Sequence, residues 1–484
     1  MDTLLIFLIF AGYSFLLLLV GYITSRKADN TTFFNAGRSS PWFVVSYGMI
    51  GASLSGITFI SVPGNVLHTQ FSYLVMVFGY LAGYILIATI LLPLYYRLNL
   101  ISIYAYLRER FGYYAHKTGA TFFLLSRIIG ASLRMYIVVS ILQYLIFEHW
   151  GIPFWITVLF FVMLIWAYTF KGGIKTVVWT DTLQTTFMLA SVVLTVYVIS
   201  RSLNMSVFDL WEKISEAGYT KTFYLTEWQD PKYYLKMFLG GMFIALAMTG
   251  LDQDMMQKNL TCRNLKDARK NVITLGIILI PINFLFLFLG AVLYYYAEQY
   301  HLELPQDTDK IFSTVVFHLG MVPGAVFLVG LIAAAYSSAD SALTSLTTSF
   351  SLDILEIDRM PAGKAKKEKI RKAVHIAVSL LIVMLILVLH TYKDDAIITI
   401  LFKLAGYTYG PLLGLYSFGL FTKRKVPDKV IPWLAVASPL LTWYVNAHSQ
   451  EWFWNYEFGF ELLILNAAIM FAGLFIFSKK QGEG

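Results

Sequence analysis

Residues 333–348 read AAAYSSADSALTSLTT, a helix-length piece that carries one carboxylate and seven serine or threonine hydroxyls. It directly follows the apolar run MVPGAVFLVGLI (321–332), so we expect Asp340 to lie inside a membrane-spanning helix. A charged side chain at that depth is costly and usually marks the path of an ion or a substrate. The stretch therefore predicts both the class of the fold and the position of its functional site.

Side chains three or four residues apart share one face of a helix. In this stretch that face presents small and hydroxyl-bearing side chains, with Asp340 beside it: Ala334, Ser337, Ser338, Ser341, Ser345 and Thr348. Hydroxyls with one carboxylate suit a small alkali or alkaline-earth cation, because transition metals prefer histidine or cysteine ligands. Alternatively, hydroxyls in membrane helices bond to their own or a neighbouring helix. We favour that alternative for Ser345, Thr347 and Thr348, and ion binding for Ser337, Ser338 and Asp340.

The composition argues against a soluble globular protein. The 484 residues are 58% hydrophobic and only 14% charged, and the mean hydropathy is +0.65. Apolar runs of about 20 residues, long enough to cross a bilayer, recur along the chain. We predict an all-α polytopic membrane protein with thirteen spans, at 3–24, 42–66, 71–96, 119–148, 153–170, 176–200, 235–256, 271–298, 322–350, 373–391, 396–421, 430–447 and 460–478.

The basic residues predict the orientation of the chain in the membrane. The odd-numbered connections and the C-terminal tail hold 27 of the 37 lysines and arginines, whereas the other connections hold six. Because cytoplasmic loops carry the excess of basic residues, we place the N-terminus outside and the C-terminus in the cytoplasm of a plasma (inner) membrane. This bias explains the net charge of +8, so the charge does not indicate nucleic-acid binding.

Two spans are predicted to be interrupted. The second contains Gly51, Gly56 and Pro63-Gly64, and the seventh contains Gly240-Gly241 and Thr249-Gly250. Paired interrupted helices in two halves of a chain point to a transporter site at the middle of the bilayer. Their offset of five spans is the one expected for two five-helix units of inverted topology. Close packing of membrane helices through small residues is the alternative explanation.

Three further charged residues fall in apolar segments. Asp181 lies about one and a half turns into the sixth span, where it needs a cation, a proton or an arginine. Arg127 and Arg134 are seven residues apart and so share a helix face. Each could pair with Asp181 or Asp340, or could bind the carboxylate of an anionic substrate. Asp252 and Asp254, at the end of the seventh span, suit capping or gating contacts.

Five motifs resemble the sodium–solute symporter family, which includes sodium-coupled glucose, proline, sialic acid, iodide and monocarboxylate transporters. The motifs are AAAYSSADSAL (333–343), GGIKTVVWTDTLQ (172–184), TGLDQDMMQKNL (249–260), LNLISIYAYLRERFG (98–112) and YGPLLGLYSFGLF (409–421). The resemblance implies a LeuT-like inverted repeat of five plus five helices with one extra helix before it and two after it. One integral domain, 1–484, would then comprise 1–40 (extra helix and loop), 41–200 and 235–421 (the two repeats) and 430–484 (two peripheral helices).

The resemblance also implies sodium ligands. The principal site would use carbonyl groups of Gly51, Leu54 and Ala334 with the hydroxyls of Ser337 and Ser338. Family members with a second sodium site would build it from Asp181, Ser337, Asp340 and Ser341. One or two sodium ions are therefore expected as the coupling ion.

Substrate contacts implied by the resemblance come from the interrupted second span and from facing helices. They are Ser53, Ser55, Thr58, Tyr73 and Phe243, with Arg127 or, in an alternative register, Arg134 for a carboxylate. The segment ASLSGITFISVPG (52–64) is most similar to the branches that carry anions. Sugar-carrying members have a tyrosine gate where this chain has Met248.

We therefore predict a sodium-driven symporter that imports a small polar, anionic solute by alternating access. A sugar or polyol symporter and a proton-coupled porter using Asp181 or Asp340 remain alternatives. A sensor of the same fold would usually need a signalling domain. An enzyme is the least favoured alternative, because the sequence shows no arrangement of a nucleophile with a base. The expected partners are the solute and the lipid bilayer, with no nucleic acid and no obligate protein partner.

Overall fold

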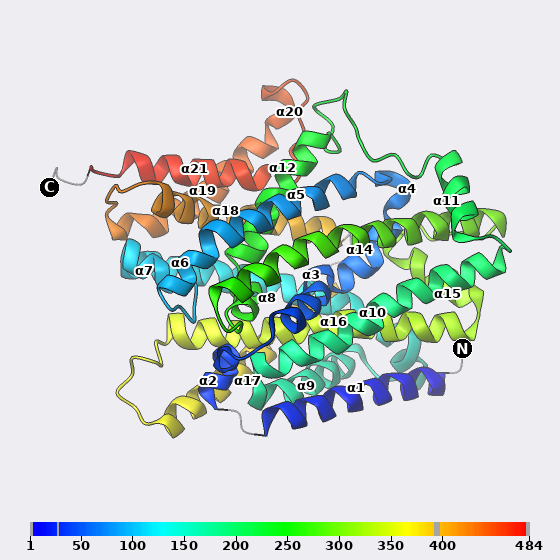
Figure 1. The fold of residues 1–484 in the computed structure, drawn as a ribbon, viewed down its shortest axis with the longest axis horizontal. Helices are drawn as coiled ribbons and strands as arrows, with labels where there is room; N and C mark the ends of the chain where they lie inside the picture. The colour runs from blue at the N-terminus through cyan, green and yellow to red at the C-terminus, as the bar shows by residue number, and fades with distance from the viewer. Residues whose placement is uncertain (1–2, 27–28, 392–396, 481–484) are drawn as a thin grey trace.

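The computed structural model describes residues 3–26, 29–391 and 397–480, and within them the chain is helical, with isolated β-bridges but no strand. The long helices run along one axis of the molecule (Figure 1). Each of the thirteen predicted ranges overlaps one of the following: α1 (Thr3–Ser25), α3 (Trp42–Gly64), α5 (Tyr73–Leu86), α8 (Tyr113–Leu142), α9 (Phe154–Gly172), α10 (Ile174–Ser202), α12 (Tyr234–Ala245), α14 (Leu265–Gln299), α16 (Met321–Ser349), α17 (Lys364–Thr391), α18 (Ile397–Phe421), α19 (Ile431–Ala447) and α21 (Leu462–Ile476).

Shorter helices connect these or extend them. α5 continues through a π-helical turn, η2 (Ile87–Leu91), into α6 (Leu92–Arg97), and α16 ends in a similar turn, η7 (Phe350–Ile354). The remaining short helices are α2 (Asn30–Asn35), α4 (Val66–Thr69), α7 (Ala105–Arg110), α11 (Val207–Glu216), α13 (Gln253–Asn259), α15 (Ile311–Leu319) and α20 (Ser449–Trp452).

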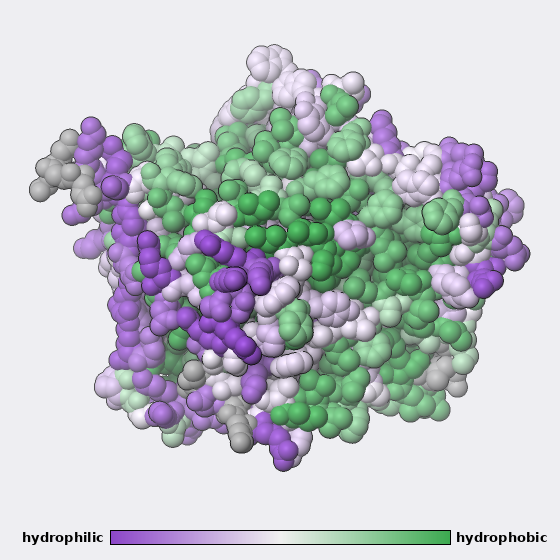
Figure 2. All heavy atoms as spheres, viewed as in Figure 1, coloured by the Kyte–Doolittle hydropathy of each residue, from purple (hydrophilic) through white to green (hydrophobic). Residues whose placement is uncertain are grey.

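The outer surface is that of a membrane protein. Apolar residues cover the middle of the face shown in Figure 2, and hydrophilic residues gather toward its ends. Exposed side chains of the peripheral helices are large and apolar, among them Phe15, Leu194, Ile277, Leu380 and Trp433. By length and composition, nine helices of the described residues could cross a membrane, or up to eleven if each of two bent pairs is one span. Thirteen crossings therefore stay a prediction.

The hydroxyl-rich helix α16 lies at the centre of the bundle. Every residue from Phe327 to Ser349, except half-buried Val329, is buried, and α16 packs against α3, α8 and α10. A helix with so many hydroxyls is stable in this position because they bond to carbonyls of its own preceding turn or to side chains of its neighbours. Thr347 and Thr348, for example, each donate to the carbonyl four residues earlier, as predicted for the hydroxyls at this end.

Both predicted interruptions are present. α3 bends by 56° between Leu54 and Thr58, and α12 with its π-helical extension η5 (Leu246–Gly250) meets α13 at 71°. The second break follows Thr249-Gly250, whereas the prediction that Gly240-Gly241 also interrupts the span was wrong. Both glycines lie inside α12, and a Cβ at Gly241 would be 2.0 Å from the carbonyl oxygen of Met76. The small size of Gly241 serves close packing against α5, and that of Gly240 serves packing against Phe460.

Candidate functional site

The bend in α3 faces the hydroxyl face of α16. Gly51 has room for no side chain, since a Cβ there would lie 2.5 Å from Thr185 Oγ1 and 3.3 Å from Ser337 Oγ. The Gly51 amide donates to Thr185 Oγ1 on α10 at 3.0 Å. Ser338 Oγ lies 3.4 Å from the Ala334 carbonyl oxygen, and Leu54 ends the first half of α3. A bend of this size frees carbonyl groups from intrahelical bonding, which makes them available to a cation.

Replacing Gly51 by alanine is expected to open this contact. The added methyl group would have to push α3 away from α10 and α16, because the nearest atoms belong to short side chains rather than flexible ones. We expect a fall in midpoint of thermal unfolding of about 2–5 °C and loss of the sodium-induced rise in that midpoint. Gly12→Ala on the exposed side of α1, where nothing lies within 4 Å, is the matched control and should change neither. An unaltered sodium response in Gly51→Ala would contradict the close approach at this position.

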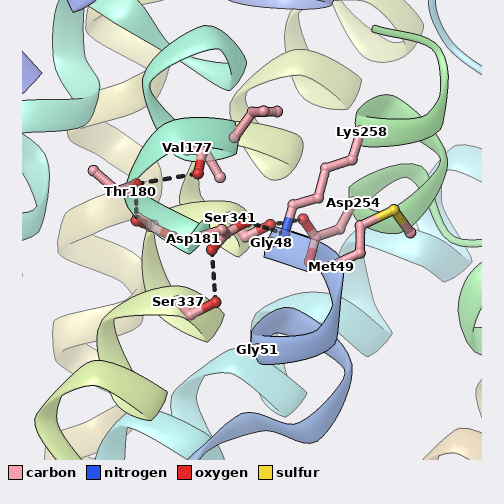
Figure 3. A network of polar contacts seen from close by, with 12 residues as sticks. Gly48, Met49, Gly51, Val177, Thr180, Asp181, Asp254, Lys258, Ser337 and Ser341 are labelled. Atoms are coloured by element: carbon pink, nitrogen blue, oxygen red, sulfur yellow. Dashed lines mark hydrogen bonds and ion pairs between the residues drawn. The ribbon is translucent and has the colours of Figure 1, made fainter. Parts of the chain in front are cut away.

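Asp181 of α10 is buried beside this contact and has two partners (Figure 3). Its Oδ1 accepts a hydrogen bond of 2.6 Å from Ser337, and its Oδ2 lies 2.7 Å from Lys258 Nζ. The sequence predicted a cation for Asp181 but not this one, because Lys258 was placed in a cytoplasmic connection. The structure instead folds residues 253–259 into the interior as α13, all of them buried.

The other two residues of the predicted second sodium site have different partners. Asp340 Oδ2 accepts hydrogen bonds from Tyr168 (2.9 Å) and Thr180 (3.2 Å). Ser341 donates to Asp254 of α13. The resemblance implied four side chains for the second sodium site. Within the described residues, only two of them, Asp181 and Ser337, are hydrogen-bonded to each other.

A cavity of about 90 Å³ lies next to the α3 bend, on the side of α5, α8, η5 and α14. Five of the predicted substrate residues line it: Ser53, Thr58, Tyr73, Arg127 and Arg134. The side chain of Ser55 is outside the described residues. Within the described part of the chain Phe243 does not line the cavity. Ile244 of α12 and Met248 of η5 line it instead.

Several lining residues were missed from the sequence. Tyr80 and Tyr84 of α5 join Tyr73, and the Tyr73 and Tyr80 hydroxyls lie 3.2 Å apart. Asn283 of α14 donates to the Leu279 carbonyl but leaves its buried Oδ1 without a partner. The spacing of seven residues between Tyr73 and Tyr80 predicts that they share a helix face. The neighbouring sequence does not indicate that this face lines the cavity.

The two arginines of α8 differ in their surroundings. Arg127 forms an ion pair with Asp254, and its Nη1 lies 3.8 Å from Asp252 Oδ2. Among the described residues no carboxylate forms an ion pair with Arg134, which is only 8% exposed and whose Nε has no hydrogen-bond partner. The prediction that an arginine pairs with Asp181 or Asp340 was wrong, because the partner of Arg127 is on α13. Arg134 thus contributes a positive charge without an ion-pair partner to the cavity wall.

Polar contacts join α8 and its neighbours in two layers. In the first, Asp252 caps α13 and accepts a hydrogen bond from Tyr409 of α18, next to the Arg127–Asp254 pair. In the second, His116 Nε2 lies 2.9 Å from Asp353 Oδ1, and Lys117 pairs with Glu356 at 2.6 Å. The hydrogen bond from Lys117, helped by Arg108, lowers the pKa of Glu356 to about 2.

Comparisons with known proteins find sodium-coupled transporters of similar sequence and fold. The sodium/sialic acid symporter NanT of Aliivibrio fischeri is 23% identical over 451 residues, covering 92% of this chain and 88% of that one. The sodium/sialic acid symporter SiaT of Proteus mirabilis is 25% identical over 425 residues, covering 85% and 84%. A solved substrate-bound outward-open state of a Na+-coupled sialic acid symporter has the same fold, with a TM-score of 0.83, 22% identity and coverage of 98% and 99%.

The family itself follows from a wider match. Residues 33–427, which include the α3 bend, the ion pairs of α13 and the hydroxyl face of α16, match the sequence profile of the sodium:solute symporter family. This chain belongs to the sodium:solute symporter family.

Proposed function

We propose that this protein imports a small hydroxylated carboxylate, of the sugar-acid class, together with sodium. Sodium coupling follows from the family to which the chain belongs. The sialic acid carried by the two relatives described above is a solute of this class.

The single observation that carries the anionic substrate is Arg134. A buried guanidinium without a carboxylate partner is unfavourable unless a ligand supplies one. A guanidinium binds a carboxylate through two parallel hydrogen bonds, which a neutral sugar lacks the charge to match. The unpaired Asn283 Oδ1 and the Thr58 hydroxyl, on the same cavity wall, suit hydroxyl groups of the solute.

The principal sodium site is proposed at the contact of α3 with α16. Carbonyl oxygens of Gly51, Leu54 and Ala334 and the hydroxyls of Ser337 and Ser338 would surround the ion. Because the sodium site and the cavity share α3, sodium that holds α3 against α16 also fixes Ser53 and Thr58. Coupling of this kind is reciprocal, so the solute must raise sodium affinity by the factor by which sodium raises solute affinity.

Alternating access is proposed to proceed in a bundle of thirteen spans with the N-terminus outside. The chain starts at one end of the long axis and finishes at the other (Figure 1), which is what an odd number of crossings would give. The inverted repeat of 41–200 and 235–421 would move around the two bent helices. Opening toward the cytoplasm would separate the Arg127–Asp254 and His116–Asp353 layers.

Uptake into proteoliposomes tests the function. Purified protein would be reconstituted and given an inward sodium gradient with radiolabelled N-acetylneuraminic acid, and unlabelled sugar acids, monocarboxylates and neutral sugars would compete. We expect sodium-dependent uptake and competition by hydroxylated carboxylates. Competition by neutral sugars alone would support the sugar symporter instead. Uptake driven by a pH gradient in sodium-free buffer would refute sodium coupling.

A further inference from the structure

The position at which the resemblance places a second sodium ion contains an amino group of the chain. Lys258 Nζ is 2.7 Å from Asp181 Oδ2, and each of the two side chains is only 1% exposed. The second carboxylate oxygen of Asp181 accepts the Ser337 hydroxyl hydrogen at 2.6 Å. Both oxygens of the acid are therefore already engaged, and its charge is compensated.

The fold brings Lys258 to this position through the bend after η5. α13 turns 71° away from the preceding helix and is buried along its whole length, with Asp252 capping its first turn. Figure 3 shows Lys258 extending from this helix toward Asp181, with its nitrogen next to Gly48 of α3. Gly48 also lets α3 pass close to α10 at this point, since a Cβ there would lie 3.0 Å from Asp181 Cβ.

The remaining members of the predicted site do not complete a sodium shell. Asp340 accepts hydrogen bonds from Tyr168 and Thr180, and Ser341 donates to Asp254. A sodium ion beside Asp181 would have to share the carboxylate with an ammonium ion a few ångströms away. Two positive charges at such a separation in a buried site repel each other strongly, so the donor set does not fit a second ion.

We propose that the Lys258 ammonium is the permanent cation of this second position and that the chain binds one sodium ion per transport cycle. This inference rests on the proposed function. Asp181 then acts as a positioning residue, because it accepts the Ser337 hydrogen and so directs the lone pairs of Ser337 Oγ toward the principal sodium site. Import of a monovalent carboxylate with one sodium moves no net charge, and the membrane potential does not drive it.

Sodium stoichiometry tests the proposal directly. Equilibrium dialysis of the purified chain against ²²Na⁺ is expected to give one bound ion per wild-type chain and none in Ser338→Ala. Two bound ions in the wild type would overturn the inference and leave sodium symport intact. No bound ion would refute the proposed function, and the claim of a single ion with it.

A mutant cycle tests the role of Lys258 separately. Lys258→Met removes the ammonium and leaves Asp181 available, so the number of bound sodium ions should rise from one to two. Lys258→Met/Asp181→Asn, the matched control, should again bind one. In potassium buffer each single variant should unfold about 5 °C below the wild type, because a buried charge loses its partner, and the double variant should recover most of the difference. Single variants as stable as the wild type in potassium, or additive losses in the double variant, would overturn the proposal even if sodium binding could not be measured in them.

Discussion

Replacing Arg134 by glutamine is expected to reduce sodium-driven uptake of the carboxylate solute about 100-fold at subsaturating concentration. The loss reflects removal of one partner of a buried, hydrogen-bonded charge pair, which typically costs about 2–5 kcal/mol. Glutamine keeps a hydrogen-bonding amide but is shorter and uncharged, so the variant removes the guanidinium from the cavity. Uptake of the same labelled solute into proteoliposomes, compared at equal protein incorporation, measures the effect.

The thermal stability of Arg134→Gln should not fall together with its uptake activity. Without solute, Arg134 is a buried charge with no ion-pair partner among the described residues, and neutralising it should leave the unfolding midpoint unchanged or raise it. The sodium-induced shift should persist, because Arg134 is not part of the α3–α16 contact. Arg134→Lys is the control that keeps the charge but loses the two-pronged geometry, and it should retain an intermediate rate. Wild-type uptake in Arg134→Gln would remove the main support for an anionic substrate.

Replacing Asp254 by asparagine should give the largest loss of stability. The substitution leaves Arg127 buried. The nearby carboxylate that remains is Asp252, whose Oδ2 lies 3.8 Å from Arg127 Nη1. Breaking a buried ion pair by removing one partner costs about 3–5 kcal/mol. We expect unfolding at least about 5 °C below the wild type in both sodium and potassium, since the pair does not depend on the ion. Thermal unfolding of the purified variant measures the change.

Ser341→Ala provides the matched comparison. It removes the hydrogen bond from α16 to Asp254 but keeps the ion pair with Arg127, so it should cost only about 1 kcal/mol. Equal effects of the two variants would mean that the hydrogen bond, and not the charge pair, holds α13 in place. A wild-type midpoint for Asp254→Asn would contradict the ion pair altogether.

The fold could be predicted from the sequence to the extent that it depends on local patterns. Apolar runs located the long helices, and the glycines near residues 51–56 and 249–250 located the two bends. The pattern failed at Gly240-Gly241, because a glycine pair that interrupts a helix and one that packs closely against its neighbours have the same local sequence. Only the position of Met76, more than 160 residues away in the chain, distinguishes the two cases.

The site was predicted less completely, because its charges are paired by elements far apart in sequence. Arg127 and Arg134 share a face of α8, so spacing alone gave them equal roles. The two arginines differ because α13 places Asp254 against Arg127 and not against Arg134. Lys258 was counted with the basic residues of a cytoplasmic connection, because the predicted seventh span ended at residue 256. Burial of that run, and with it the partner of Asp181, is a property of the tertiary fold.

Thermal unfolding in sodium against potassium tests the central claim most directly, that sodium binds where α3 meets α16. A ligand that binds only the folded state stabilises it by about 2.7 kcal/mol at one hundred times its dissociation constant. We predict that sodium, but not potassium at equal ionic strength, raises the wild-type unfolding midpoint. Ser338→Ala should abolish this rise, and in potassium it should lower the midpoint by no more than about 2 °C. Indistinguishable wild-type midpoints in the two salts over a wide concentration range, or a full sodium response in Ser338→Ala, would contradict it.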